Sequence, residues 1–281
     1  MTVAVRAVTP AERGQLAQQG LRIGDHSAAY LLAPERGMGA VAVLAERGFE
    51  SEILALPTRS LEEIRGAAPG EPSPAQIAHL LAALKGEGAR LVTCRRPESD
   101  RAILLALQAG GFRVIECLLT LSRALDGAIP AMPSAVSLAT SADANGCAAV
   151  GATAFRYDRF HADTAIERSR ADALKAAWAR NAARGRADAV FVTRAGGAVT
   201  GFNACLLRGD TAVIDLIGVA PAHQGRGLGR LLTDAALAHY AGRAKRVVVG
   251  TQSCNHASLS LYQRAGFRIE SSALTLHAHL L

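Results

Sequence analysis

Features that would assign this chain to a membrane-bound or secreted class are missing from its 281 residues. No apolar run approaches the roughly 20 residues that a membrane-spanning helix needs. Charged side chains at Arg6, Glu12 and Arg13 interrupt the start of the chain, which lacks a signal-peptide pattern. We therefore expect a cytoplasmic protein that binds no membrane.

Cysteine is scarce, and its spacing carries no motif. The five cysteines are scattered along the chain: Cys94, Cys117, Cys147, Cys205 and Cys254. Their number is odd and no Cys-x-x-Cys pair occurs, which argues against a disulfide framework and against a structural zinc site. We expect buried, reduced thiols and no bound metal.

Lysine is nearly absent, since only three of the 31 Lys and Arg residues are lysines. The formal net charge is +7. The basic residues are spread along the chain without a dense cluster, and aromatic residues make up only 4 % of it, so the usual signature of a nucleic-acid-binding surface is missing. We expect no nucleic-acid partner. The positive field favours an anionic ligand such as coenzyme A or a nucleotide.

What the chain does contain is enough hydrophobic sequence for a core, and an internal repeat. Half of the residues are hydrophobic and 20 % are charged, as in a globular protein. Residues 111–121 resemble residues 266–276 without a gap, which indicates two related halves. A segment at 124–134 with two prolines and a glycine marks the boundary between them. We predict two domains, residues 1–123 and residues 135–281.

A glycine-rich turn in the second half has the composition of an anion-binding site. Residues 224–229 read Gln-Gly-Arg-Gly-Leu-Gly and follow a predicted strand that ends at Val219. A predicted helix comes next, and its first N–H groups and its dipole attract anions. Arg226 and Arg230 flank the turn and can pair with phosphates. No Gly-Lys-Ser/Thr follows, which excludes a P-loop, while an ordinary strand-to-helix connection remains an alternative.

Three segments, in this order, resemble the GNAT N-acetyltransferases. Residues 214–219 resemble the family's splayed strand, the glycine turn its Q-x-x-G-x-G/A signature, and residues 255–267 its N-x-x-A-x-x-x-Y-x-x-x-G-F segment. The resemblance covers about residues 135–281. It implies an α/β GNAT fold with a mixed, largely antiparallel sheet flanked by helices, here duplicated with a degenerate N-terminal half.

The resemblance also implies acetyl-CoA as the co-substrate. The residues expected to contact it are Ile217, Gly218, Val219, Gln224, Gly225, Arg226, Gly227, Leu228, Gly229, Arg230 and Asn255. Asn255 also fits a simpler role as the N-cap of the following helix.

Tyr262 is the candidate catalytic acid. It follows Asn255 by two helical turns, so both can face one cleft, and a phenol beside the thioester can protonate the leaving thiolate. The alternative is that Tyr262 is simply a core residue. The internal alignment places Leu107 at the matching position and Asp100 opposite Asn255, so packing there does not require a tyrosine. The first half also has Gly70-Glu-Pro-Ser-Pro in place of the glycine turn.

No residue stands out as the general base that would neutralise the attacking amine. Asp215 lies on the splayed strand, and His223 lies next to the glycine turn. Cys254 precedes Asn255, but no histidine–carboxylate set supports a covalent cysteine route. The base is therefore left unassigned.

The acceptor is inferred from a narrower resemblance. Ala154-Phe155 with Arg159-Phe160, the segment 178–185, and Thr251-Gln252 are similar to the dTDP-fucosamine acetyltransferases within this family. This implies acetylation of the amino group of a nucleotide-linked sugar. Three residues of the basic and aromatic loop are the candidate acceptor contacts: Arg159, Phe160 and His161.

Other functions remain open on the sequence alone. They are acetylation of a protein N-terminus, acetylation of an antibiotic amine, and non-catalytic coenzyme A binding in a regulatory protein. An ordinary solvated loop is the alternative for the candidate acceptor contacts. The partners expected are acetyl-CoA and a small amine, and a homodimer is compatible with the sequence.

Overall fold

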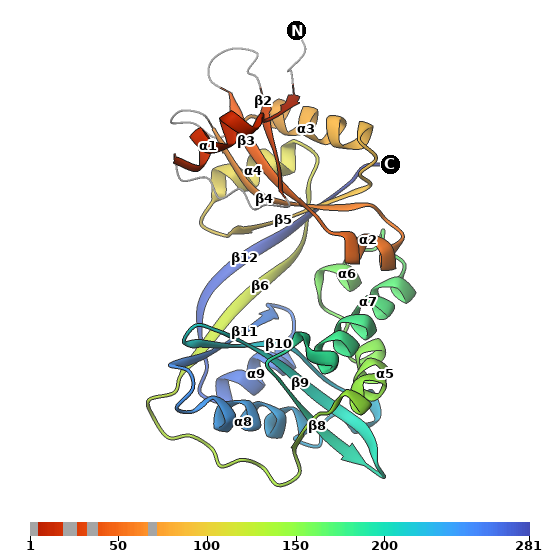
Figure 1. Cartoon of the computed structure of the whole chain (residues 1–281), viewed down its shortest axis with the longest axis vertical. Helices are drawn as coiled ribbons and strands as arrows, with labels where there is room; N and C mark the ends of the chain where they lie inside the picture. The colour runs from red at the N-terminus through yellow and green to blue at the C-terminus, as the bar shows by residue number, and fades with distance from the viewer. Residues whose placement is uncertain (1–4, 19–26, 33–38, 67–71) are drawn as a thin grey trace. The chain divides into compact units, whose positions relative to one another are not determined.

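The computed structural model describes residues 5–18, 27–32, 39–66 and 72–281, which form two compact units (Figure 1). Unit 1 contains residues up to Ile115 together with Ala273–Leu281, and unit 2 contains Glu116–Ser272. In the first half, the segment in place of the glycine turn begins with Gly70 and Glu71. These two residues lie outside the described part of the chain.

Unit 1 is a twisted sheet with helices packed on it. Its strands follow the order β1-β2-β3-β4-β5-β12. The strands are β1 (Val5–Ala7), β2 (Ser27–Leu32), β3 (Ala40–Glu46), β4 (Thr58–Gly66) and β5 (Leu91–Pro97), followed by the C-terminal part of β12 (Arg268–His279). The helices are α1 (Pro10–Gln18), α2 (Gly48–Leu54), α3 (Pro74–Gly86) and α4 (Arg101–Ala109).

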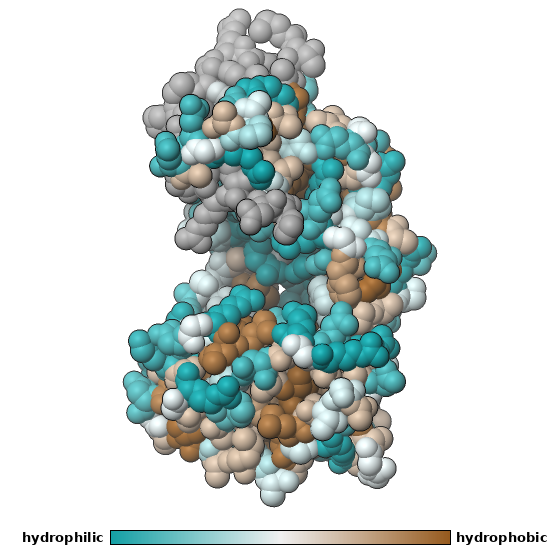
Figure 2. Space-filling model, in the orientation of Figure 1, coloured by the Kyte–Doolittle hydropathy of each residue, from teal (hydrophilic) through white to brown (hydrophobic). Residues whose placement is uncertain are grey.

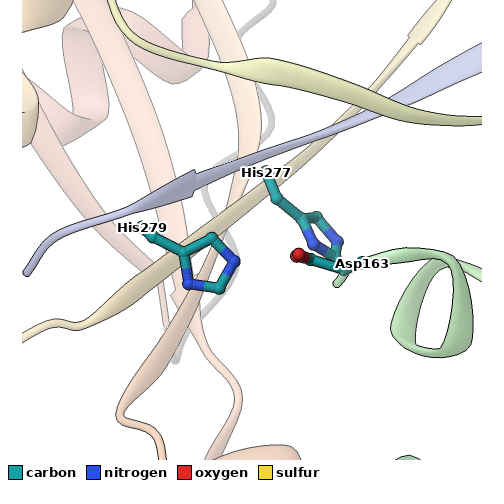
Figure 3. A group of neighbouring side chains, drawn as sticks. All are labelled: Asp163, His277 and His279. Carbon is teal, nitrogen blue, oxygen red and sulfur yellow. The ribbon is translucent and has the colours of Figure 1, made fainter. Parts of the chain in front are cut away.

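The core of unit 1 depends on α3 and on β12. A capping box begins α3, because Ser73 accepts a hydrogen bond from the Gln76 backbone and the Gln76 side chain accepts one from Ser73. Strand β12 pairs antiparallel with β5 and adds Leu276 to the core. It also carries His277 and His279, whose rings lie on the same side of the strand with centroids 6.4 Å apart (Figure 3).

Unit 2 has the strand order β12-β6-β11-β10-β9-β8-β7. The strands are β6 (Arg113–Ala124), β7 (Ser137–Leu138), β8 (Ala189–Ala195), β9 (Ala198–Arg208), β10 (Thr211–Val219) and β11 (Arg246–Gln252). The helices are α5 (Ala144–Ala154), α6 (Arg159–Ala162), α7 (Arg168–Asn181), α8 (Leu228–Tyr240) and α9 (His256–Arg264). Short turns of 3-10 helix, η1 (Ser141–Asp143) and η3 (Pro221–His223), and a π-helical turn, η2 (Ala182–Arg186), connect them.

Helices cover both faces of the unit 2 sheet. Helices α8 and α9 pack on one face, in a core that includes Leu232, Val249 and Tyr262. Helices α5 and α7 pack on the other face, in a core that includes Val150 and Phe202 (Figure 1). The strand alternation of β11 explains this division, because Val247 and Val249 face α8 and α9 while Val248 and Gly250 face the opposite side.

Both halves of the chain follow one plan, as the internal repeat predicts. Two antiparallel strands lead to a third strand, which runs parallel to the next one: β4 pairs with β5, and β10 with β11. Helix α3 or α8 makes the first crossover, and α4 or α9 leads to the last strand. The mixed sheet flanked by helices confirms the expected α/β class.

The units differ from a simple cut of the chain at residues 123 and 135. Most of β6 comes from the first half of the chain, but it pairs with β11 of unit 2 from Ala124↔Arg246 to Leu118↔Gln252. The end of β12 comes from the second half, but it pairs with β5 of unit 1. Each half therefore supplies its last strand to the sheet of the other unit.

Hydrophobic residues are scattered over the face of unit 2 that Figure 2 shows. Figure 2 shows brown patches separated by teal and white residues on this face. The large exposed hydrophobic side chains of the unit include Met132, Leu138 and Tyr157. Among the described helices, none has the length and apolarity needed to span a bilayer.

Candidate active site

The sheet of unit 2 opens between its two parallel strands. Strands β10 and β11 pair from Thr211↔Arg246 to Ile214↔Val249, and there the ladder between them ends. A bulge at Asp215 shifts the register of β10 against β9. Beyond it, β10 continues to Val219 beside β9, while the end of β11 stays with β6. The backbones of residues 216–219 and 250–252 therefore border an opening at this end of the sheet, as expected for a splayed strand.

The glycine turn lies directly after this splayed strand. The Gln224 side chain donates a hydrogen bond to the Val219 carbonyl at 2.9 Å, which fixes the turn to the strand end. Gly225 and Gly227 have φ of +74° and +78°, a left-handed conformation that glycine adopts without strain. Apart from the glycine itself and its two neighbours in sequence, no heavy atom of the described residues lies within 4 Å of the Cβ position at either glycine. The turn is thus exposed around open space rather than packed against the core.

Helix α8 begins at this turn and directs its N-terminus toward it. Gly227 is the N-cap, and the first helical bond is donated by the Arg230 N–H to the Gly227 carbonyl at 2.9 Å. The N–H groups before Arg230 have no partner inside the helix and are available to an anion. Leu228 and Gly229 form the first turn, and Gly229 packs closely against Leu261 of α9. The turn therefore fits the pyrophosphate of coenzyme A.

The two arginines beside the turn differ in their surroundings. Arg226 is exposed. Arg230 pairs with Asp234 one helical turn later at 2.8 Å, and it donates to the Arg264 carbonyl at 3.0 Å. Arg230 thus ties α8 to the end of α9, and it would have to leave these partners to contact a phosphate.

Helix α9 carries the candidate acid. Asn255 is its N-cap, and its side chain accepts a hydrogen bond from the Ser258 N–H at 3.2 Å, so the simpler role considered for it is present. Tyr262 is buried with 1 % exposure, and its ring lies 5.6 Å from that of Phe267. Burial raises the pKa of Tyr262, which keeps its phenol protonated at neutral pH.

The residues considered as a general base lie in different surroundings. Asp215 is the bulge residue of β10, and its carboxylate forms an ion pair with Arg186 of η2. His223 ends η3 and is half-buried beside the turn. Cys254 is exposed.

The candidate acceptor contacts form a buried cluster instead of an open loop. Phe160 is 1 % exposed and packs against Trp178, with ring centroids 5.8 Å apart. Its ring therefore has no free face on which a sugar or base could stack. Arg159 lies over the same ring, with its guanidinium carbon 4.5 Å from the centroid.

His161 is enclosed by two carboxylates. Its Nδ1 lies 2.6 Å from Asp158 and its Nε2 lies 3.0 Å from Asp172. Burial alone would lower the pKa of His161, but the hydrogen bond and charge of Asp158 outweigh it and raise that pKa. His161 is therefore a structural link between α6 and α7 in this conformation, which differs from the exposed acceptor contact that the sequence predicts.

Lys175 is the functional candidate that the sequence analysis missed. Its ammonium lies 3.3 Å from Asp158 and over the rings of Phe155 and Trp178, at 5.1 and 4.6 Å from their centroids. Burial lowers the pKa of Lys175, while Asp158 opposes this shift. One feature of the sequence could have pointed to it. Lys175 is one of only three lysines in the chain, and the other basic residues of its helix are arginines.

This cluster reaches the opening in the sheet through Phe155. A β-carbon at Gly218 would lie 3.0 Å from Ala154 and 3.4 Å from the Phe155 ring. Gly218 belongs to the splayed part of β10, so Phe155 packs directly on the strand that borders the opening. Phe155, with Lys175 over its ring, thus forms part of the wall on the α5 and α7 side.

Comparison with known proteins agrees with this geometry. The sequence profile described as the acetyltransferase (GNAT) family matches residues 153–267, the segment that holds the opening, the glycine turn and Tyr262. This matched segment of the chain is similar to the GNAT acetyltransferases.

Two relatives illustrate the range of similar proteins. The spore coat polysaccharide biosynthesis protein SpsD of Bacillus subtilis is 31 % identical over 124 residues, which cover 44 % of this chain and 43 % of SpsD. A mycothiol acetyltransferase of Amycolatopsis mediterranei is 32 % identical over 179 residues, covering 58 % of this chain and 57 % of that protein. The matches thus span about half the length of these relatives.

Solved structures show the same fold over nearly the whole chain. A GCN5-related N-acetyltransferase from Sphaerobacter thermophilus superposes with a TM-score of 0.61 at 16 % identity, over 99 % of this chain and 95 % of that one. A tandem GNAT protein from the clavulanic acid biosynthesis pathway superposes with a TM-score of 0.57 at 15 % identity, over 98 % of this chain and 90 % of that one. The duplicated GNAT fold is therefore an architecture with solved examples.

Proposed function

We propose that the chain transfers the acetyl group of acetyl-CoA to the primary amine of a nucleotide-linked amino sugar. One observation carries the acetyl-CoA part of this proposal. The opened strand pair leads directly into a glycine turn that surrounds open space at a helix N-terminus, with Gln224 fixing one to the other. A thioester arm can pair with the splayed strand while the backbone of the turn binds the pyrophosphate.

Tyr262 is proposed as the general acid. The neutral amine attacks the thioester carbonyl, a C–N bond forms, and the C–S bond breaks. The departing thiolate takes the phenolic proton of Tyr262, the new amide releases one N–H proton to water, and water returns a proton to the phenolate. Its phenol is protonated at neutral pH, because burial among apolar side chains raises its pKa.

A sugar acceptor is supported by the similarity to SpsD, whose name places it in polysaccharide biosynthesis. The net charge of +7 also favours a substrate that carries phosphates. The similarity to proteins named mycothiol acetyltransferase supports a second candidate for the acceptor, which is the compound that those proteins acetylate.

The test is a panel of acceptors assayed by release of free thiol from acetyl-CoA. The panel contains dTDP-, UDP- and GDP-linked amino sugars, the acceptor of the mycothiol acetyltransferases, an aminoglycoside and a peptide amine. We expect turnover with a nucleotide-linked amino sugar. Turnover confined to another member would reject the sugar-nucleotide acceptor, and acetyl-CoA binding without turnover of any member would favour a non-catalytic role.

A further inference from the structure

Two arginine side chains hold the C-terminal end of α9, the helix that carries the candidate acid. The carbonyls of residues 261–263 accept hydrogen bonds from backbone N–H groups that follow them. The carbonyl of Arg264 accepts a hydrogen bond from Nη1 of Arg230 at 3.0 Å. The next carbonyl, that of Ala265, accepts one from Nη1 of Arg123 at 2.6 Å. The carbonyls that a helix end leaves without an intrahelical partner are thus satisfied here, the last two by side chains from other elements.

Arg230 makes its contact with α9 from the first turn of α8. It is the third residue of that helix and directly follows the glycine turn. Its Nε lies 2.8 Å from both carboxylate oxygens of Asp234, and Asp234 is only 14 % exposed. Because the guanidinium is a rigid planar fork, the Asp234 pair fixes the direction in which Nη1 reaches Arg264.

The first turn of α8 contacts α9 at residues on both sides of Tyr262 in the sequence. A β-carbon at Gly229 would lie 3.3 Å from a methyl group of Leu261, the residue directly before Tyr262. Arg230 contacts the carbonyl of Arg264, two residues after Tyr262. A shift in the position of the glycine turn is therefore passed on to the part of α9 that holds Tyr262.

The internal repeat separates this link from the packing of the two helices. The alignment has Ala75 in place of Arg230 and His79 in place of Asp234. Alanine carries no side-chain donor, so the equivalent link cannot form from that position of α3. Helices α3 and α4 nevertheless share one core, which includes Leu107 at the position of Tyr262. The link thus belongs to the half of the chain that has the glycine turn and the tyrosine.

We propose that Arg230 is a positioning residue, which couples the binding of the pyrophosphate at the glycine turn to the placement of Tyr262 on α9. This role rests on the proposed function. Arg230 keeps Asp234 and the Arg264 carbonyl as partners while acetyl-CoA is bound, and the backbone N–H groups of the turn bind the phosphates. The role differs from the phosphate contact that the sequence predicts for Arg230.

The test introduces Arg230→Met into the wild-type chain and into Tyr262→Phe, with the acceptor that turns over fastest in the panel. In the wild-type chain, kcat should fall by about 10- to 10²-fold because the acid is misplaced, while acetyl-CoA affinity stays nearly unchanged. In Tyr262→Phe, Arg230→Met should have almost no further effect on kcat, because the group that it positions is gone. Arg243→Met is the matched control and should keep the wild-type kcat. Arg243 lies beyond the other end of α8, has the same side-chain exposure of 43 % and pairs with Asp188.

Hydrogen exchange of backbone amides gives a second readout, which needs no acceptor. Acetyl-CoA should slow exchange at residues 261–267 in the wild-type chain but not in Arg230→Met, although the first turn of α8 becomes protected in both.

Three results would overturn the role of Arg230. They are a loss of acetyl-CoA affinity in Arg230→Met, which would make Arg230 a phosphate contact, an equal loss of kcat with and without Tyr262, and protection of α9 that does not depend on Arg230. A wild-type protein that binds acetyl-CoA but acetylates no acceptor would instead reject the proposed function, and hydrogen exchange would still decide whether Arg230 couples the turn to α9.

Discussion

Tyr262 and Leu107 show what single residues contribute within a duplicated fold. Both are fully buried at equivalent positions of α9 and α4, so both satisfy the same packing requirement. Only Tyr262 adds a hydroxyl group that can donate a proton. The internal repeat therefore separates the packing role of this position, which Tyr262 and Leu107 share, from the chemistry of the Tyr262 side chain.

Tyr262→Phe should lower kcat by about 10²- to 10⁴-fold while leaving acetyl-CoA affinity nearly unchanged, because only the proton donor is removed. Steady-state kinetics and calorimetric titration measure the two effects separately. Tyr240→Phe is the matched control, since its buried phenol donates to Asp188 at 2.7 Å at the far end of α8. It should cost about 1 kcal/mol of stability and leave kcat unaffected. Equal kcat values in Tyr262→Phe and wild type would contradict the acid role.

The acceptor contacts mark the limit of prediction at this scale. The sequence predicts Arg159, Phe160 and His161 as acceptor contacts because basic and aromatic residues follow one another there. Sequence order does not reveal that Asp158 and Asp172 enclose His161, or that Phe160 turns inward onto Trp178.

His161 predicts a pH dependence of stability. Its folded pKa is raised, so its contribution is fully present below its ordinary pKa of about 6.5 and is lost as pH rises through the raised value. The stability difference between wild type and His161→Gln should therefore shrink as pH increases from 6 to 9. Thermal unfolding across this range measures it. A difference that grows with pH would show that His161 is neutral in the fold.

At the scale of elements, the bulge at Asp215 and the turn at residues 224–229 create the site together. The bulge separates β10 from β11, and the turn then brings the N-terminus of α8 to the mouth of that opening. The strand, the turn and the helix were each predictable from hydrophobic periodicity and glycine spacing. The bulge, the short α6 and the π-helical turn η2 were not, because they depend on contacts with other elements.

Gly227→Ala tests the turn as an element. Its φ of +78° makes any other residue strained, at a cost of about 1–2 kcal/mol, and the added methyl group enters the open space proposed for the pyrophosphate. Gly242→Ala is the matched control, with a φ of +77°, the same open surroundings and a place at the other end of α8.

Both substitutions should lower the melting temperature similarly, but only Gly227→Ala should weaken acetyl-CoA binding. Calorimetric titration and thermal unfolding give the two readouts. Unchanged affinity in Gly227→Ala, with the expected loss of stability, would show that the pyrophosphate binds elsewhere.

At the scale of the whole molecule, the halves of the sequence do not correspond to the units of the structure. The repeat predicts two related halves and the proline-containing segment at 124–134 predicts their boundary, whereas the units divide between Ile115 and Glu116. The repeat and this segment could not indicate that each half gives its last strand to the other unit, because β6 and β12 have similar sequences and either one satisfies the same hydrophobic pattern.

This exchange predicts how truncated chains behave. A fragment of residues 135–281 lacks β6 and leaves the edge of β11 unpaired, so it should unfold at a much lower temperature than residues 116–281, or aggregate. Circular dichroism during heating, with gel filtration, compares the two fragments. Equal, cooperative unfolding of both would contradict the structural role assigned to β6.

The number of acetyl-CoA molecules bound per chain tests the central claim most directly. The duplicated fold offers two equivalent positions, but the glycine turn and its open surroundings belong to unit 2. Isothermal titration calorimetry of the full chain should give one site, and Gly227→Val should abolish it because the branched side chain fills the turn. Two sites per chain, or one site that persists unchanged in Gly227→Val, would contradict an acetyl-CoA site at this turn.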